Sequence, residues 1–130
     1  MSPTFCPEDF FETAKELKDK RFPTEADLRT AVGRAYYAAY GAAKARYLAA
    51  QAPGNREIRH GEVGSIIMGV VPGPVIAKTW DALMRMRKTS DYVYDQRVTK
   101  QDARSALDHS DILLTAIRQA DDASFKKISI

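Results

Sequence analysis

Apolar residues recur along most of the chain at intervals of three and four, whereas strict alternation of apolar and polar positions is scarce. This spacing places apolar side chains on one face of a helix, so the sequence predicts an all-α fold. The expected architecture is an up-and-down bundle of about five helices, four long and one short. The helices are predicted at residues 7–21, 24–50, 63–71, 74–88 and 99–121.

Local signals define several ends of these helices. Thr24 is a good N-cap, and Thr99 followed by Asp102 approximates a capping box. Pro72-Gly73-Pro74 is a strong break. Residues 51–62 are expected to form a loop and residues 89–98 an extended link. The chain is interpreted as one domain, 1–130, with its core at about 7–123 and a frayed tail at 124–130.

The second predicted helix has two apolar sides. One carries small residues, mainly alanine, and the other carries larger ones, including Tyr36, Tyr40 and Tyr47. Such a helix is expected to be central in a bundle or partly buried in an oligomer interface. The tyrosine stripe is interpreted as core or interface, with base stacking as the alternative. Gly41, inside the helix, suggests the close approach of a neighbouring segment.

The composition mainly excludes certain kinds of site and classes of protein. The 130 residues are 45% hydrophobic and 28% charged, with a net charge of +3, which fits one folded domain and permits a nucleic-acid partner without arguing for one. A single cysteine, Cys6, excludes an intramolecular disulfide framework, and two histidines leave few ways to build a metal site. No signal peptide or membrane span is apparent, so a cytoplasmic protein without a metal or cofactor is expected.

Arg87 is the polar residue most out of place in the pattern. It falls on the apolar stripe of the fourth helix, with Trp80 and Leu83, where an unpaired charge would be costly. One interpretation is a structural ion pair with Asp91. The other is an arginine that binds an RNA phosphate or stabilises charge during phosphodiester cleavage.

Other candidates are weaker individually. Arg34 and Tyr37 flank the alanine face of the second helix, and Asp91 and Glu62 are candidate ion-pair partners for Arg34. Tyr92 and Tyr94, in the expected link, could stack on a base or be modified. His60 would ordinarily be a solvated loop histidine, and His109 reads as a packing residue.

Three segments of the chain carry a family resemblance. They are Arg34-Ala35-Tyr36-Tyr37-Ala38-Ala39-Tyr40-Gly41-Ala42-Ala43-Lys44-Ala45, His60-Gly61-Glu62-Val63 and Leu83-Met84-Arg85-Met86-Arg87-Lys88-Thr89-Ser90-Asp91-Tyr92. In order and spacing they resemble the central RxAYYAxxxAAKA helix, the HxGV segment and the LxxxRxxxDY segment of HEPN domains, over roughly residues 10–118.

The resemblance implies a bundle of about five helices, usually a homodimer. Many such proteins are endoribonucleases or toxins of prokaryotic toxin–antitoxin and phage-defence systems, and a common partner is a minimal nucleotidyltransferase that modifies a tyrosine. Catalytic members carry an Arg-x4–6-His motif, but here Asp91 and Tyr92 follow Arg87 and no histidine does. The resemblance therefore assigns no catalytic histidine.

Two functional hypotheses follow. The first is a toxin-like or defence-associated protein that acts on or binds RNA at a dimer cleft. Its expected catalytic residues are Arg87, Asp91 and Tyr92, and its expected binding residues are Arg34, Tyr37, His60 and Tyr94. The alternative is a non-catalytic module that binds a nucleotidyltransferase, a nucleotide or another protein. A purely structural dimerisation domain is a third interpretation.

Overall fold

The computed structural model describes residues 5–51 and 58–128. Within these ranges the chain forms six α-helices and no β-strand, which confirms the all-α prediction. The helices are α1 (Asp9–Lys18), α2 (Glu25–Ala50), α3 (Glu62–Val70), α4 (Pro74–Tyr92), α5 (Lys100–Gln119) and α6 (Asp122–Lys126). Residues 52–57 of the predicted loop lie outside the described residues.

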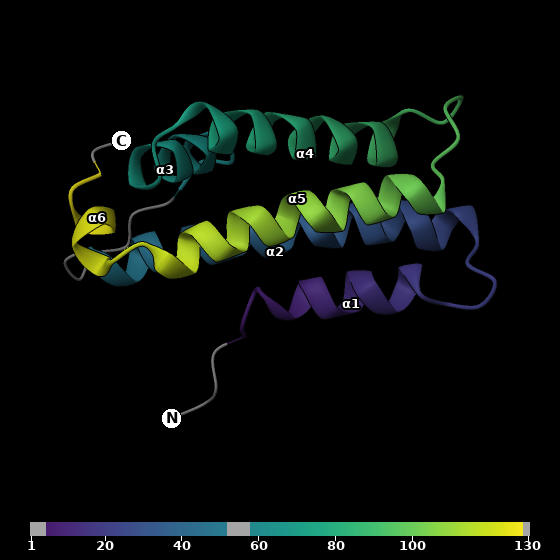
Figure 1. Ribbon diagram of the computed structural model, residues 1–130, viewed down its shortest axis with the longest axis horizontal. Helices are drawn as coiled ribbons and strands as arrows, with labels where there is room; N and C mark the ends of the chain where they lie inside the picture. The colour runs from purple at the N-terminus through teal and green to yellow at the C-terminus, as the bar shows by residue number, and fades with distance from the viewer. Residues whose placement is uncertain (1–4, 52–57, 129–130) are drawn as a thin grey trace.

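Four of the helices form the body of the bundle. Helices α1, α2, α4 and α5 lie side by side with alternating directions, and α3 and α6 lie together at one end (Figure 1). None of the helices in the described ranges is long and apolar enough to cross a membrane.

Helix α2 is the centre of the bundle, because it contacts each of the other helices. Its small residues let neighbours approach: Ala31, Ala35 and Ala38 are completely buried. A Cβ atom at Gly41 would overlap the ring of Pro7, so the close approach predicted at this glycine is confirmed. The two apolar sides of α2 are thus covered within one chain.

Capping boxes begin α2 and α5, at the two threonines predicted as N-caps. At α2 the Thr24 hydroxyl accepts from the Asp27 backbone N–H at 3.0 Å, and Asp27 Oδ2 accepts from the Thr24 N–H at 3.0 Å. Thr99 and Asp102 repeat this arrangement at α5, at 3.2 and 2.8 Å. Each box satisfies two backbone N–H groups that would otherwise have no partner.

The expected frayed tail is wrong for residues 124–126, which belong to α6. Phe125 is completely buried, and the Arg46 guanidinium lies 4.5 Å from the centre of its ring. Arg46 also donates to the carbonyls of Ile117 and Ala120, both at 2.8 Å. These contacts hold α6 against α2 and the end of α5.

Two other boundaries differ from the prediction. Helix α1 ends at Lys18 rather than near residue 21, because the side chains just beyond it are exposed and gain no packing from a further turn. Helix α4 continues to Tyr92, although we expected it to end at Lys88. The second difference changes the geometry of the candidate site.

Candidate functional site

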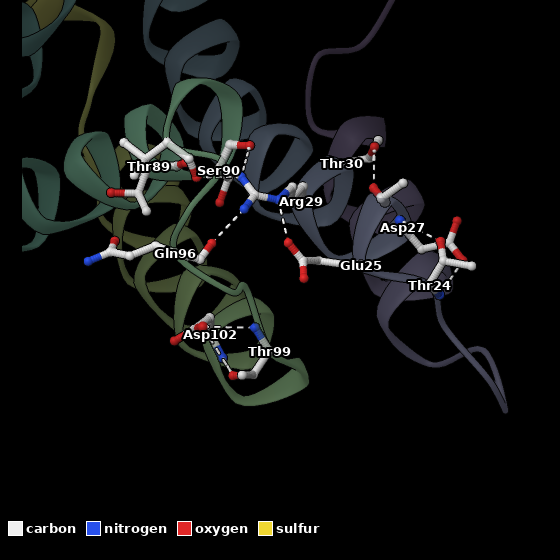
Figure 2. Close-up of polar contacts among 12 residues, drawn as sticks. Thr24, Glu25, Asp27, Arg29, Thr30, Thr89, Ser90, Gln96, Thr99 and Asp102 are labelled. Carbon is white, nitrogen blue, oxygen red and sulfur yellow. Dashed lines mark hydrogen bonds and ion pairs between the residues drawn. The ribbon is translucent and has the colours of Figure 1, made fainter.

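Arg29 of α2 explains why α4 is longer than expected. Its Nη1 atom donates to the carbonyls of Ser90 and Val93, at 2.9 and 3.0 Å, and lies 3.3 Å from that of Thr89. Its Nη2 atom donates to the carbonyl of Gln96 at 2.5 Å (Figure 2). The last carbonyls of a helix lack partners within it, and here one guanidinium from another helix supplies them. Residues 89–92 are therefore helical rather than extended.

The longer helix places Asp91 one turn beyond Arg87. Arg87 Nε lies 3.0 Å from Asp91 Oδ2, which is the ion pair that the sequence suggested. The Nε–H bond is not aligned with this oxygen, and the buried Nε atom has no hydrogen-bond acceptor. The pair is therefore electrostatic, without a hydrogen bond at Nε.

Tyrosines of α2 surround the Arg87 guanidinium. Its Nη2 atom donates to the Tyr37 hydroxyl at 2.8 Å. The guanidinium also lies 5.4 Å from the ring centres of Tyr36 and Tyr37 and 5.6 Å from that of Tyr92. Only 13% of the Arg87 side chain is exposed. Aromatic faces and Asp91 thus stabilise a largely buried positive charge.

His60 joins the same cluster from the segment just before α3. Its Nε2 atom lies 2.6 Å from the Tyr36 hydroxyl, and its ring stacks on Tyr40 with the centres 4.6 Å apart. Burial, together with the positive charges of Arg87, Lys88 and Lys44, lowers the pKa of His60. His60 is therefore neutral at pH 7, with a lone pair on one of its two ring nitrogens.

Tyr36 and Tyr40 stay protonated. Burial raises the pKa of Tyr36 and of Tyr40. Tyr36 is completely buried and Tyr47 is 2% exposed, so neither ring can stack on a base. The interpretation of these two residues as core is confirmed. We call the whole cluster the tyrosine–arginine site; it consists of Tyr36, Tyr37, Tyr40, His60, Arg87, Asp91 and Tyr92.

Arg34 borders this site without forming the ion pair with Asp91 that we considered. Its guanidinium lies 4.8 Å from the ring centre of Phe10 in α1 and 5.6 Å from that of Tyr37. Beside it, a hollow of about 300 Å³ lies between α2 and α4, with Arg34, Tyr37 and Asp91 in its lining. A ligand in this hollow would meet a guanidinium, a phenol and a carboxylate.

Tyr92, at the end of α4, and Tyr94, just beyond it, lie in different surroundings. Tyr92 is 64% exposed and its ring lies beside Arg87, at the rim of the site. Tyr94 is 80% exposed and lies over Arg29 instead, 5.8 Å from its guanidinium. The fold thus brings together all the predicted site residues except Tyr94.

Three contacts around the site were not predicted. Neither Phe10 nor Arg29 was among the expected site residues, and the Tyr36 hydroxyl was not expected to meet His60. Only the Tyr36–Tyr40 spacing, one helical turn, hinted at a shared face. The contacts of Phe10 and Arg29 join residues far apart in the chain, so no local pattern reveals them.

The available groups define the chemistry. A fixed guanidinium can bind a phosphate, and a neutral imidazole can accept a proton. In the described ranges no group of three or more histidine, cysteine, aspartate or glutamate side chains is placed to hold a metal ion. Comparisons of the chain with protein-family models, curated proteins and solved structures found no match.

Proposed function

We propose that the protein is a HEPN-type bundle that acts on RNA at the tyrosine–arginine site, as a toxin-like or defence-associated protein. One observation carries the proposal: a buried arginine and a neutral histidine are bonded to adjacent tyrosines of one helix. Arg87 donates to Tyr37, and His60 contacts Tyr36. Phosphodiester cleavage needs both a positive group at the phosphate and a proton acceptor.

The roles follow from the contacts. Arg87, whose charge is already desolvated, binds the non-bridging phosphate oxygens and stabilises the negative charge that develops there. When His60 Nε2–H donates to the Tyr36 hydroxyl, the lone pair on Nδ1 is free. His60 then takes the proton of the ribose 2′-hydroxyl. The base is thus supplied from outside α4, unlike in the Arg-x4–6-His motif.

The reaction balances without a cofactor. The 2′-oxygen forms a bond to phosphorus, and the bond from phosphorus to the 5′-oxygen of the next nucleotide breaks. The proton of the 2′-hydroxyl passes to His60, and the leaving oxygen takes a proton from water. The products are a 2′,3′-cyclic phosphate and a 5′-hydroxyl end.

The test is cleavage of end-labelled single-stranded RNA by the purified protein in the presence of EDTA. We expect cleavage to persist in EDTA and to leave 2′,3′-cyclic ends. Arg87→Ala and His60→Asn should each reduce the rate by about 100-fold or more, the usual cost of removing such a group. His109→Asn is the matched control, because the His109 ring is bonded to the Ser105 carbonyl of its own helix.

Two results would overturn the assignment. Equal activity in His60→Asn and the unmodified protein would show that His60 is not the proton acceptor. A loss of thermal stability in Arg87→Ala that matches its loss of activity would make Arg87 structural. Arg87→Lys separates the two explanations further, because it keeps the charge but cannot reproduce the planar donor geometry.

Tyr92 favours one alternative. Its exposed phenol, beside Arg87, is accessible to a second protein, as a binding module for a nucleotidyltransferase would require. Two results together would support that function. RNA would stay intact after incubation with the purified protein, and a small nucleotidyltransferase encoded beside this protein would transfer a nucleotide to the unmodified chain but not to Tyr92→Phe. Sedimentation at micromolar concentration tests the homodimer that the family resemblance implies, and a monomer there would exclude a cleft shared between two chains.

A further inference from the structure

The hollow of about 300 Å³ between α2 and α4 adjoins the tyrosine–arginine site and has no part in the cleavage steps described above. Its lining shares Tyr37 and Asp91 with that site. Both residues contact Arg87: the Tyr37 hydroxyl lies 2.8 Å from Nη2, and Asp91 Oδ2 lies 3.0 Å from Nε. A group in the hollow would therefore lie next to a phosphate held by Arg87.

The two carboxylate oxygens of Asp91 lie in different surroundings. Oδ2 is the oxygen close to Arg87. Oδ1 faces α2 at Gly33, 3.7 Å from the point where a Cβ atom of that residue would lie. No hydrogen bond to Oδ1 is formed within the described ranges, and the Asp91 side chain is 35% exposed. This oxygen is therefore an accessible acceptor in the lining of the hollow.

Gly33 leaves the space beside that oxygen open, and packing does not explain why a glycine is there. At the other glycines inside the described helices a Cβ atom would lie 2.6 Å or less from a neighbouring side chain; these are Gly41, Gly64 and Gly69. At Gly33 the same atom would make only an ordinary contact with Asp91. Because glycine is less stable than alanine in a helix interior, the fold itself gains nothing from Gly33.

Arg34 supplies the hydrogen-bond donors of the hollow. Its guanidinium lies over the rings of Phe10 and Tyr37, and within the described part of the chain no carboxylate or carbonyl accepts a hydrogen bond from it. Contacts with ring faces leave the N–H groups in the guanidinium plane free. Arg29 also lines the hollow, but its Nη atoms donate to the carbonyls at the end of α4.

We propose that the hollow binds a guanine base and thereby selects the bond that is cleaved. Guanine offers two acceptors, O6 and N7, to a guanidinium, and two neighbouring N–H groups, at N1 and N2, to a carboxylate. Arg34 donates to the first pair, and Asp91 Oδ1 accepts from the second. The volume is at the lower end of the range of small-molecule sites, which suits a single base. This assignment rests on the proposed function, because it names the substrate of the same site.

The position of His60 determines the side of the cleaved bond on which the guanosine lies. His60 contacts Tyr36 and Tyr40, and neither His60 nor Tyr40 lines the hollow. The α2 residues of the lining extend from Ala26 to Tyr37, toward the beginning of the helix. The nucleotide whose 2′-hydroxyl meets His60 lies on the 5′ side of the phosphate. The base in the hollow therefore belongs to the nucleotide on the 3′ side, and cleavage occurs immediately 5′ of guanosine.

The experiment compares RNA strands of uridine that carry G, A, C or U at one central position. Gel electrophoresis measures cleavage of the bond on the 5′ side of this position. We expect the guanosine strand to be cleaved about tenfold faster than the others or more, as a well-formed base contact predicts. Inosine, which lacks the N2 amine, and 7-deazaguanosine, which lacks N7, should each be cleaved about threefold more slowly than guanosine or less.

Variants are compared by the ratio of the cleavage rates on the guanosine and adenosine strands, because a general loss of activity does not change this ratio. Arg34→Gln should lower the ratio about fivefold or more. Gly33→Ala should also lower it, since the methyl group lies against Asp91 Oδ1, but its Tm should not fall. Arg104→Gln is the matched control: it removes the same charge from an exposed position on α5, outside this hollow, and should leave the ratio unchanged.

Binding separates the base site from the cleavage reaction. Strands with a 2′-deoxynucleotide before the central position cannot form the cyclic phosphate, and fluorescence anisotropy measures their affinity. Stronger binding of the guanosine strand, without cleavage of its all-ribose form, would support the base site and refute the cleavage. Cleavage without a preference for guanosine would refute the base site alone. A preference for another base, an unchanged ratio in both Arg34→Gln and Gly33→Ala, or no binding of any strand would also overturn the base site.

Discussion

Replacing Arg29 by methionine should destabilise the end of α4 and the site that it carries. Methionine keeps most of the apolar stem but removes the donors to the carbonyls of Thr89, Ser90, Val93 and Gln96. The Arg29 side chain is only 15% exposed, so water cannot fully replace these bonds without movement of the chain.

The magnitude follows from these contacts. A hydrogen bond to a charged group contributes about 1.5–3 kcal/mol, but bonds made by one guanidinium are not additive. The freed carbonyls also lie near the surface, where water recovers part of the loss. We therefore expect Arg29→Met to lower the free energy of unfolding by about 3 kcal/mol, which corresponds to a decrease of about 10 °C in Tm for a chain of this size.

Urea denaturation measures the loss, and hydrogen exchange localises it. Exchange should accelerate most in residues 89–96, and RNA cleavage should fall because Asp91 and Tyr92 belong to the same turn of α4. Glu25→Gln is a control: it breaks only the exposed ion pair to Arg29 and should cost about 0.5 kcal/mol or less. A loss below 1 kcal/mol in Arg29→Met, or exchange that accelerates evenly along the chain, would refute the reasoning.

Three further predictions concern other parts of the molecule. Phe125→Ala should lower the free energy of unfolding, measured by urea denaturation, by about 3 kcal/mol, since it empties a completely buried position. A loss near zero would show that α6 does not unfold together with the rest of the bundle. Gly64→Ala should cost about 1–3 kcal/mol and shift the fluorescence of Trp80, the sole tryptophan, because the new Cβ would lie 2.6 Å from its Nε1 atom; unchanged fluorescence would contradict this packing. By NMR, His60 should titrate below 6.5, and its neutral form should contribute stability above pH 6.5 that is lost as the pH falls through its lowered pKa. A midpoint at or above 6.5 would contradict the assignment of His60 as a neutral base.

Local signals predicted the parts of the fold that local interactions determine. The capping boxes at Thr24 and Thr99 involve residues three positions apart, so the sequence contains all of their information. The burial of α2 also follows from its own composition. The end of α4 does not, because its hydrogen-bond donor, Arg29, is about sixty residues away in the chain. The tail was mispredicted for the same reason, since Arg46 and the core that receives Phe125 are distant in sequence.

The candidate site also has a part that the sequence predicts and a part that it does not. Arg87 was recognisable because a charge on an apolar stripe needs a partner, and Asp91 at the next helical turn is that partner. The contact between His60 and Tyr36 depends on how the segment before α3 folds back onto α2, which no periodicity reveals. Tyr94 was grouped with Tyr92 only because the two are neighbours in a segment that was expected to be extended.

The scarcity of histidine makes the proton acceptor unusually easy to test. The sequence contains two histidines. His109, on α5, lies beside the hollow lined by Lys78 and Arg85, on another side of α4 from the tyrosine–arginine site. Within one chain His60 is therefore the imidazole available to a phosphate bound at Arg87. If cleavage depended on His109 instead, a second copy of the chain would have to supply it, and mixing Arg87→Ala with His109→Asn protein would then restore activity. The two single variants and their mixture thus distinguish a site within one chain from a site shared between two.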